Sequence, residues 1–317
     1  MNLVHDTVKN MFLHYASISG DIGSLSSDKL ATTPYSNINI VILNQIIQSN
    51  SKNEKPIIYT CFGALGDLMH LLYVINIKFL ITGRRGKLLI SNRAFTQDVF
   101  ITHKNTYDFI MMQPCIASYE VDANPYSAYE YTQSNTNDYV NLNDWRFSRY
   151  CYTMDWYTNL EDCYNLNLRI NPPWLVYTNT NVNKNKFEDM IVIHRSPRRN
   201  IDNFPWETIL KTNRNVIFVS CVESEYENFK YKNLVEFWHA KTFDDLVCAI
   251  YNCKYFIGNL SCPLALAYGF AKPCLGELER ESFYGTLTKY HPNFSWISKE
   301  NTKIFNTDGY LTLDFVK

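Results

Sequence analysis

Short apolar segments alternate with amphipathic ones over most of the chain after residue 55. Ile57–Cys61 and Lys87–Ser91 are apolar, β-rich runs that predict strands. We expect Asp108–Gln113 to be a third strand. Between the first two runs, apolar residues recur at helical spacing and predict one buried helix face: Leu68, Leu71, Leu72, Ile75 and Phe79. A strand, a helix and a strand with short connections predict a parallel sheet with right-handed crossovers.

The alternation restarts beyond a boundary marked by Asn171-Pro172-Pro173 and the polar stretch Thr178–Lys186. Apolar runs there predict strands at Met190–Arg195, Asn215–Ser220, Leu234–Trp238, Tyr255–Gly258 and Pro273–Leu275. The stretches between them predict helices at Trp206–Lys211, Ser224–Lys230, Thr242–Cys253 and Pro263–Phe270. Strands and helices that alternate at this spacing are typical of a doubly wound α/β domain.

These patterns predict an α/β protein with two Rossmann-like, doubly wound domains, which suits a chain of 317 residues. We assign residues 55–177 to an N-terminal domain and residues 187–317 to a C-terminal domain. Residues 1–54 form an N-terminal extension that we expect to pack on the first domain. Tyr119–Asn143, rich in Asn, Tyr and Ser, predicts a long irregular loop. Two such domains joined by a Pro-containing hinge would place a ligand cleft between the carboxyl ends of both sheets.

Composition narrows the class of protein. Hydrophobic residues make up 46% of the chain and charged residues 19%, which is enough to build a core. The formal net charge of −1 argues against a nucleic-acid partner, although a local basic patch stays open. The nine cysteines form no C-x-x-C pair, the N-terminus lacks a signal-peptide pattern, and no uninterrupted apolar run reaches the ~18 residues of a membrane span. We therefore expect a cytoplasmic protein with free thiols and no transmembrane segment.

A glycine-containing turn follows the first predicted strand and opens the first helix. Gly63 and Gly66 permit tight turns and close approach of a ligand, and the helix start offers free N–H groups. Asp67 lies at this helix start. It is either a helix cap or a carboxylate that accepts a proton from an acceptor hydroxyl. The spacing is not G-x-G-x-x-G, so it does not indicate a dinucleotide cofactor.

A basic segment follows the first strand of the C-terminal half. It contains His194, Arg195, Arg198 and Arg199, with a serine among them. Guanidinium groups bind phosphate oxygens in a bidentate manner, so this segment is a candidate diphosphate site. The alternative is a solvated basic loop in which His194 only packs or orients a neighbour.

A third candidate lies where the strand Tyr255–Gly258 passes into an apolar helix. Asn259 ends the strand, and Ser261 would cap the helix, whose N-terminus suits a phosphate or is a plain cap. Glu223 and Glu225 follow another strand, where a carboxylate could hold a ribose hydroxyl or merely be surface charge. No His, Cys, Asp or Glu spacing indicates a metal site, and no cofactor is predicted.

These segments together resemble the heptosyltransferase family that builds the lipopolysaccharide inner core, which has the GT-B fold. Gly66-Asp-Leu-Met-His70 resembles the family's Gly-Asp-x-x-His segment, in which the Asp is the proposed catalytic base. His194-Arg-Ser-Pro-Arg-Arg199 resembles its phosphate-binding loop, and Thr242–Gly269 its nucleotide segment. Where the family has Asp-Ser/Thr-Gly and then His, this chain has Leu260, Ser261, Cys262 and Ala265. The family's phosphate-loop lysine has no counterpart, and Arg198 or Arg199 would take its place.

The resemblance implies a metal-independent, inverting glycosyltransferase with a nucleoside-diphosphate sugar as donor and a glycan or other hydroxyl as acceptor. Asp67 would be the general base on the acceptor side. The nucleotide-sugar side would use Gly63, Gly66, His194, Arg195, Arg198, Arg199, Glu223, Glu225, Asn259 and Ser261. Three alternatives remain. The first two are a catalytically degenerate sugar-nucleotide-binding protein and a GT-B-fold sugar-nucleotide epimerase. A transferase that modifies a DNA base is the third, against which the net charge counts.

Overall fold

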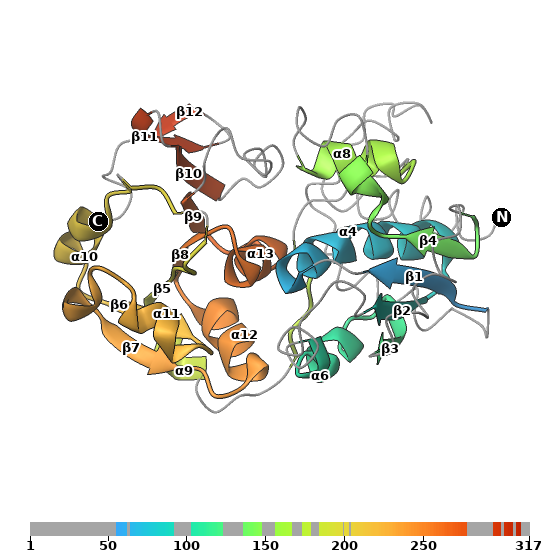
Figure 1. The fold of residues 1–317 in the computed structure, drawn as a ribbon, viewed down its shortest axis with the longest axis horizontal. Coiled ribbons are helices and arrows are strands. Elements are labelled where there is room, and N and C mark those ends of the chain that lie inside the picture. The colour runs from blue at the N-terminus through green and yellow to red at the C-terminus, as the bar shows by residue number, and fades with distance from the viewer. Residues whose placement is uncertain are drawn as a thin grey trace, which may run out of the picture.

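A computed structural model describes most of the chain between residues 55 and 277. The described ranges are 55–61, 64–91, 103–122, 136–147, 156–166, 173–178, 184–198, 200–202 and 204–277, with the backbone of 294–298, 301–306 and 309–311. The predicted N-terminal extension lies outside these ranges. The chain forms two largely parallel sheets flanked by helices, as expected for an α/β protein (Figure 1).

The first sheet has the strand order β3-β2-β1-β4, and all of its pairs are parallel. Its strands are β1 (Ile57–Cys61), β2 (Gly86–Ser91), β3 (Ile116–Asp122) and β4 (Tyr139–Asn141). Its helices are α4 (Leu65–Thr82), α6 (Tyr107–Met111) and α8 (Trp156–Cys163), with the 3₁₀ helix η1 (Asp144–Phe147). The predicted strand–helix–strand unit at β1, α4 and β2 is confirmed, because β1 and β2 pair in parallel across the intervening helix.

Two predictions in this half are wrong. Asp108–Gln113 is not a strand: its apolar residues lie in the helix α6, which buries Phe109 and Ile110. A short apolar run has the same pattern in a buried helical turn as in a strand, so periodicity could not separate them. The expected irregular loop Tyr119–Asn143 is regular at its ends, where β3 extends to Asp122 and β4 covers Tyr139–Asn141, and residues 123–135 lie outside the described ranges.

The second sheet has the order β12-β11-β10-β9-β8-β5-β6-β7 and is parallel from β10 to β7. Its strands are β5 (Ile191–His194), β6 (Val216–Ser220), β7 (Glu236–His239), β8 (Tyr255–Asn259), β9 (Cys274–Glu277), β10 (Phe294–Ser298), β11 (Asn301–Asn306) and β12 (Gly309–Leu311). Its helices are α9 (Lys184–Phe187), α10 (Trp206–Thr212), α11 (Glu223–Glu227), α12 (Phe243–Asn252) and α13 (Cys262–Gly269), with the 3₁₀ helix η2 (Lys232–Leu234). The predicted strands and helices of this half are confirmed, apart from shifts of a few residues at their ends.

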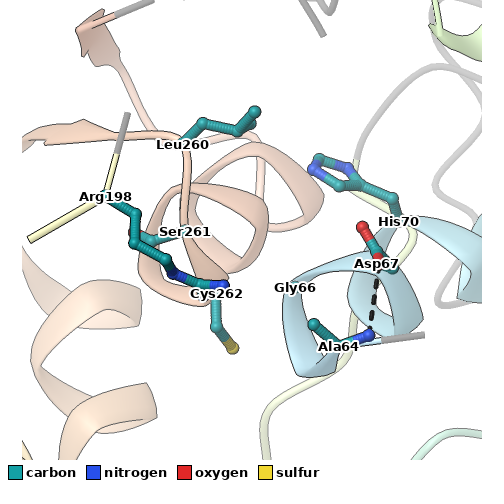
Figure 2. Close-up of a pocket in the computed structure, with 8 residues that line it drawn as sticks. All are labelled: Ala64, Gly66, Asp67, His70, Arg198, Leu260, Ser261 and Cys262. Atoms are coloured by element: carbon teal, nitrogen blue, oxygen red, sulfur yellow. Dashed lines mark hydrogen bonds between the residues drawn. The ribbon is translucent and has the colours of Figure 1, made fainter. Parts of the chain in front are cut away.

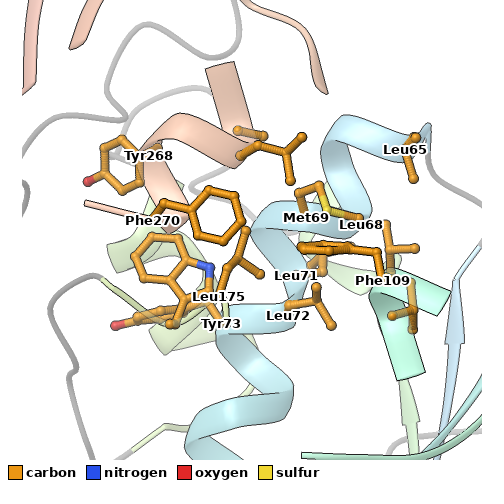
Figure 3. Packing of buried hydrophobic residues seen from close by; sticks show 14 of the residues in the cluster. Leu65, Leu68, Met69, Leu71, Leu72, Tyr73, Phe109, Leu175, Tyr268 and Phe270 are labelled. Atoms are coloured by element: carbon orange, nitrogen blue, oxygen red, sulfur yellow. The ribbon is translucent and has the colours of Figure 1, made fainter. Parts of the chain in front are cut away.

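Helices α4 and α13 pack against each other between the two sheets (Figure 1). One hydrophobic cluster includes buried residues from both sheets, and aromatic side chains surround the helix contact (Figure 3). Tyr157 stacks on Tyr268 with ring centroids 5.2 Å apart. By length and composition α4 could cross a membrane, but 72% of it is buried inside the protein, as in the core helix of a globular fold.

The segment 173–178 lies between the two halves of the chain, and its residues 174–177 are buried. The backbone N–H groups of Trp174 and Leu175 both donate to the carbonyl oxygen of Gly269, at 3.0 and 3.1 Å. Asn76 on α4 donates its side-chain amide to the carbonyl of Trp174 at 3.1 Å. Gly269 has no room for a side chain, because an added Cβ would lie 2.5 Å from Leu175 Cδ1. The predicted boundary at Pro173 therefore passes directly into a tightly packed segment.

Candidate functional site

A cleft opens where the N-termini of α4 and α13 meet. It has a volume of about 490 Å³, including the part open to solvent. Figure 2 shows Asp67 and His70 on α4 facing Arg198, Ser261 and Cys262. Ala64, Gly66 and Leu260 complete the lining. The two helix starts approach each other so closely that a Cβ at position 66 would lie 3.2 Å from the backbone nitrogen of Cys262. This close approach favours glycine at position 66.

Asp67 combines the two roles that the sequence left open. Its Oδ2 accepts the N–H of Ala64 at 3.1 Å, so it caps the start of α4 from the third helical position. The same oxygen accepts a hydrogen bond from Arg146 Nη2 at 2.5 Å, and the Asp67 side chain is 15% exposed. Among the residues that the structure describes, Asp67 Oδ1 has no hydrogen-bond donor. One carboxylate oxygen is therefore held in place while the other is available to a ligand.

His70 lies one helical turn after Asp67 and is almost completely buried. Its Nδ1 is 2.7 Å from the hydroxyl of Tyr157, and its Nε2 has no hydrogen-bond partner within the described part of the chain. Burial lowers the pKa of His70 to about 3, so the imidazole is neutral at neutral pH. His70 thus presents a neutral, partly unsatisfied side chain at the wall of the cleft.

The basic segment after β5 is shaped by two buried polar side chains. Glu277 is fully buried and accepts hydrogen bonds from Arg195 at 2.8–3.2 Å, from the backbone N–H of Ile201 at 2.7 Å and from Trp206 Nε1 at 3.3 Å. Asn259 accepts the N–H of Ser196 at 3.0 Å and donates to backbone carbonyls of the same loop. The structure therefore places Arg195 and Asn259 behind the cleft, where they hold the loop.

Arg198 and Ser261 are the polar side chains that this loop and α13 direct to the cleft. Arg198 is exposed, and its guanidinium makes no hydrogen bond or ion pair with the residues described here. Ser261 occupies the N-cap position of α13, but its hydroxyl lies 3.0 Å from the carbonyl oxygen of Asn259 instead of capping the helix. The N-terminus of α13 and the guanidinium of Arg198 thus share one side of the cleft.

His194 and Glu225 meet directly behind Ser261. His194 Nε2 is 3.0 Å from Glu225 Oε2, and His194 Nδ1 is 3.4 Å from Ser261 Oγ. Burial raises the pKa of Glu225, but the hydrogen bonds and charge of His194, the Ser220 hydroxyl and the charge of Arg198 outweigh this and hold it below its usual range. Glu223 is exposed at the start of α11 and does not line the cleft.

The cleft therefore gathers Gly66, Asp67, Arg198 and Ser261 from the predicted site and places His194 and Glu225 immediately behind it. Gly63 and Arg199 lie outside the described residues. Sequence reasoning missed Arg146, because nothing local links a residue after β4 to one 79 positions earlier. It named His70 only as part of a motif, whereas burial and the unpaired Nε2 make it part of the wall. Within the described ranges, no group of three His, Cys, Asp or Glu side chains is arranged to hold a metal ion.

Comparison with known proteins gives similarities in fold alone. No protein-family model and no curated protein matches the chain. The family 9 glycosyltransferase from Veillonella parvula is similar over 77% of this chain and 86% of its own, with 12% identity and a TM-score of 0.48. ADP-heptose LPS heptosyltransferase II from E. coli covers 77% and 90% at 12% identity and a TM-score of 0.45, and E. coli heptosyltransferase WaaC covers 70% and 88% at 10% identity and 0.44. These TM-scores are below 0.5, so we argue function from the residues of the cleft. In fold, and at low identity, the chain resembles the glycosyltransferases and heptosyltransferases that its sequence motifs indicated.

Proposed function

We propose that this protein is a glycosyltransferase that moves a sugar from a nucleoside-diphosphate sugar to an acceptor hydroxyl. One observation carries the proposal: the cleft brings the carboxylate of Asp67 opposite Arg198, Ser261 and the N-terminus of α13. A base on one side and an anion-binding surface on the other match the two demands of this reaction. The acceptor must lose a proton, and the departing diphosphate must be stabilised.

The donor side is formed by α13 and the loop after β5. Backbone N–H groups at a helix start and the positive end of the helix dipole favour a phosphate group. Arg198 adds a guanidinium that can bind phosphate oxygens in a bidentate manner. We propose that these groups offset the charge of the leaving diphosphate without a metal ion. The loop that presents Arg198 is held by Asn259 and Glu277, so the donor side is preorganised.

The acceptor side is formed by Asp67. In the proposed step, Asp67 Oδ1 takes the proton of the acceptor hydroxyl while the acceptor oxygen attacks the anomeric carbon. The bond between that carbon and the diphosphate oxygen breaks, and the diphosphate leaves with the electron pair, which inverts the anomeric centre. Arg146 and the Ala64 N–H hold Oδ2, so the base keeps one orientation. The eight described cysteines are free thiols, which supports our proposal that the protein acts in the cytoplasm.

The first test is thermal unfolding with a panel of nucleoside diphosphates and their sugars, with and without magnesium. A ligand at 100 times its Kd stabilises the folded state by about 2.7 kcal/mol, which is several degrees in Tm for a chain of this size. We expect a shift that one nucleobase produces selectively and that magnesium does not change. No shift with any member of the panel would contradict a nucleotide-sugar donor.

The second test is Asp67→Asn, assayed with the donor that the panel identifies. We expect transfer to fall by about 10²–10⁴-fold with unchanged donor affinity, because Asn keeps the cap to Ala64 but loses the base. Asp138→Asn is the matched control, since Asp138 is also paired with an arginine, Arg84, at 2.6 Å but does not line the cleft. Equal activity of Asp67→Asn and the control would reduce Asp67 to a helix cap.

A binding protein without catalysis is the second candidate, and one observation favours it. Leu260 and Cys262 place apolar and thiol groups in the cleft next to Ser261, on the side proposed for the donor. Burial raises the pKa of the Cys262 thiol, which therefore adds no charge. Donor binding with no turnover across a broad set of acceptors would support this candidate over the transferase.

A further inference from the structure

Three side chains form a continuous line of contacts that ends in the cleft. Glu225 Oε2 is 3.0 Å from His194 Nε2, and His194 Nδ1 is 3.4 Å from the hydroxyl of Ser261. His194 is 4% exposed, so the imidazole is shielded from water, whereas Ser261 lines the cleft. The Ser220 hydroxyl, 2.5 Å from the same Glu225 oxygen, fixes the far end of the line. A buried imidazole thus connects a carboxylate to a hydroxyl that lines the cleft.

Two states of this line place a hydrogen bond between His194 Nδ1 and Ser261 Oγ. The Glu225 carboxylate only accepts, so His194 Nε2 must carry a proton. In the first state Nδ1 is bare and accepts the single proton of Ser261. In the second state Nδ1 carries a proton and donates to Ser261 Oγ, which frees the Ser261 proton for the carbonyl oxygen of Asn259, 3.0 Å away, or for a ligand. The first state is a neutral imidazole and the second is an imidazolium.

We propose that the Glu225–His194–Ser261 line takes up a proton when a phosphate group binds at Ser261, so that an imidazolium supports Ser261 as a hydrogen-bond donor to the phosphate. This inference rests on the proposed nucleotide-sugar function and deepens it. A phosphate oxygen accepts hydrogen bonds, so of these two states it selects the one in which the Ser261 proton is free while His194 still bonds Oγ. His194 and Glu225 are then positioning residues that act through Ser261 and add a positive charge behind the leaving diphosphate.

The charged groups around His194 favour the uptake of a proton by its imidazole when a phosphate binds. From α11, Glu225 faces Nε2; burial raises the pKa of Glu225, but the hydrogen bond and the charge of His194 help to hold it low, so the carboxylate and an imidazolium stabilise each other. From β6, the ring of Phe218 packs 6.1 Å away and Ser220 binds Glu225. Burial raises the pKa of the nearby Cys221 thiol to about 11, and that of Cys262 is also raised, so both stay uncharged. The backbone of Gly258 on β8 approaches the His194 carbonyl and carries no charge. Among the described residues that line the cleft beside Ser261, Arg198 is the cation, and a bound phosphate would offset its positive charge.

Isothermal titration with inorganic pyrophosphate tests the proposal, run at pH 7.5 in two buffers with different ionisation enthalpies. The dependence of the heat on the buffer gives the number of protons taken up. We expect the wild type to take up more protons than Ser261→Ala, by as much as about one per pyrophosphate, because the variant cannot link the phosphate to His194. Proton uptake by pyrophosphate itself cancels in this difference. Raising the pH should weaken wild-type binding relative to the variant by at most about tenfold per unit.

Two further variants make the experiment specific. His194→Gln should lose the same uptake as Ser261→Ala, and Ser261→Ala keeps the proposal testable should His194→Gln fail to fold. His239→Gln is the matched control, because His239 lies at the end of the neighbouring strand β7 but contacts only the Cys221 carbonyl and the Phe237 ring among the described residues. It should retain the wild-type uptake.

The outcomes separate this inference from the proposed function. Equal proton uptake in the wild type and Ser261→Ala, or no binding of pyrophosphate, overturns the proton-coupled line. A base-selective shift in the nucleotide panel combined with equal proton uptake would support the nucleotide-sugar donor site and contradict only the proton-coupled line. Pyrophosphate binding with the expected uptake, but no base-selective shift, would support the phosphate site while contradicting the nucleotide-sugar donor.

Discussion

The buried pair of Glu277 and Arg195 gives the most quantitative prediction about the loop that presents Arg198. Glu277 has no exposed surface, and among the described residues its two oxygens face only donors: two guanidinium nitrogens of Arg195, the N–H of Ile201 and Nε1 of Trp206. Glu277→Gln replaces one acceptor oxygen with an NH₂ group that must face a donor whichever way the amide turns. It also leaves Arg195, with 17% of its side chain exposed, without its counter-charge.

Breaking a buried ion pair by removing one charge typically costs 3–5 kcal/mol, so we expect Glu277→Gln to lower the free energy of unfolding by about 3–5 kcal/mol. At about 2–4 °C per kcal/mol, Tm should fall by roughly 6–20 °C. Urea unfolding at pH 7 measures the loss, with Glu236→Gln as the control because Glu236 is an exposed carboxylate on the same sheet. The double variant Arg195→Met with Glu277→Leu should recover only part of the loss, since it removes both charges together but leaves the Ile201 N–H and Trp206 Nε1 without their acceptor.

A loss below about 1 kcal/mol for Glu277→Gln would refute this reasoning. It would mean that water reaches the carboxylate or that Arg195 turns toward the cleft when its partner is lost. In that case Arg195 would return to the role that the sequence suggested, as a ligand of phosphate. Pyrophosphate affinity of the same variants separates these explanations, because a phosphate ligand loses affinity in Arg195→Met even when the fold is recovered.

Three other changes have defined outcomes. Gly269→Ala should lower the free energy of unfolding by about 1–3 kcal/mol, since its Cβ would lie 2.5 Å from Leu175 Cδ1, and a double-mutant cycle with Leu175→Ala should show coupling in urea unfolding. The pKa of His70 is about 3 in the folded state and about 6.5 in the unfolded state. The unfolded state therefore takes up a proton first as the pH falls below about 6.5, and the free energy of unfolding decreases. Between pH 7 and 5 the wild type should lose about 2 kcal/mol more than His70→Gln, and parallel urea curves would contradict the burial. Asn259→Ala should weaken pyrophosphate binding without contacting the ligand, because it releases the loop at Ser196 and Arg198; unchanged affinity would show that the loop holds itself.

Local patterns predicted much of the candidate site because its residues sit where elements begin and end. Gly66 and Asp67 follow the first strand, and Ser261 precedes an apolar helix, so their positions at the carboxyl edge of a parallel sheet could be expected from the order of strands and helices. The function of each charged side chain could not be predicted in the same way. Arg195, Arg198 and Arg199 look alike in sequence, yet the structure turns Arg195 to Glu277, 82 residues away, and leaves Arg198 at the cleft.

The sequence by itself determined the α/β class, the alternation of strands and helices, and the helix starts at which a ligand can bind. Hydrophobic periodicity carries this information because it reports which side of each element is buried. Only the tertiary structure decided that α6 is a helix, that Arg146 holds Asp67, and that Glu225, His194 and Ser261 form one line. These features depend on which distant residues the packing of α4 and α13 and the order of the strands bring within hydrogen-bond distance. Partner choice for a buried charge is set by that geometry and not by its neighbours in the chain.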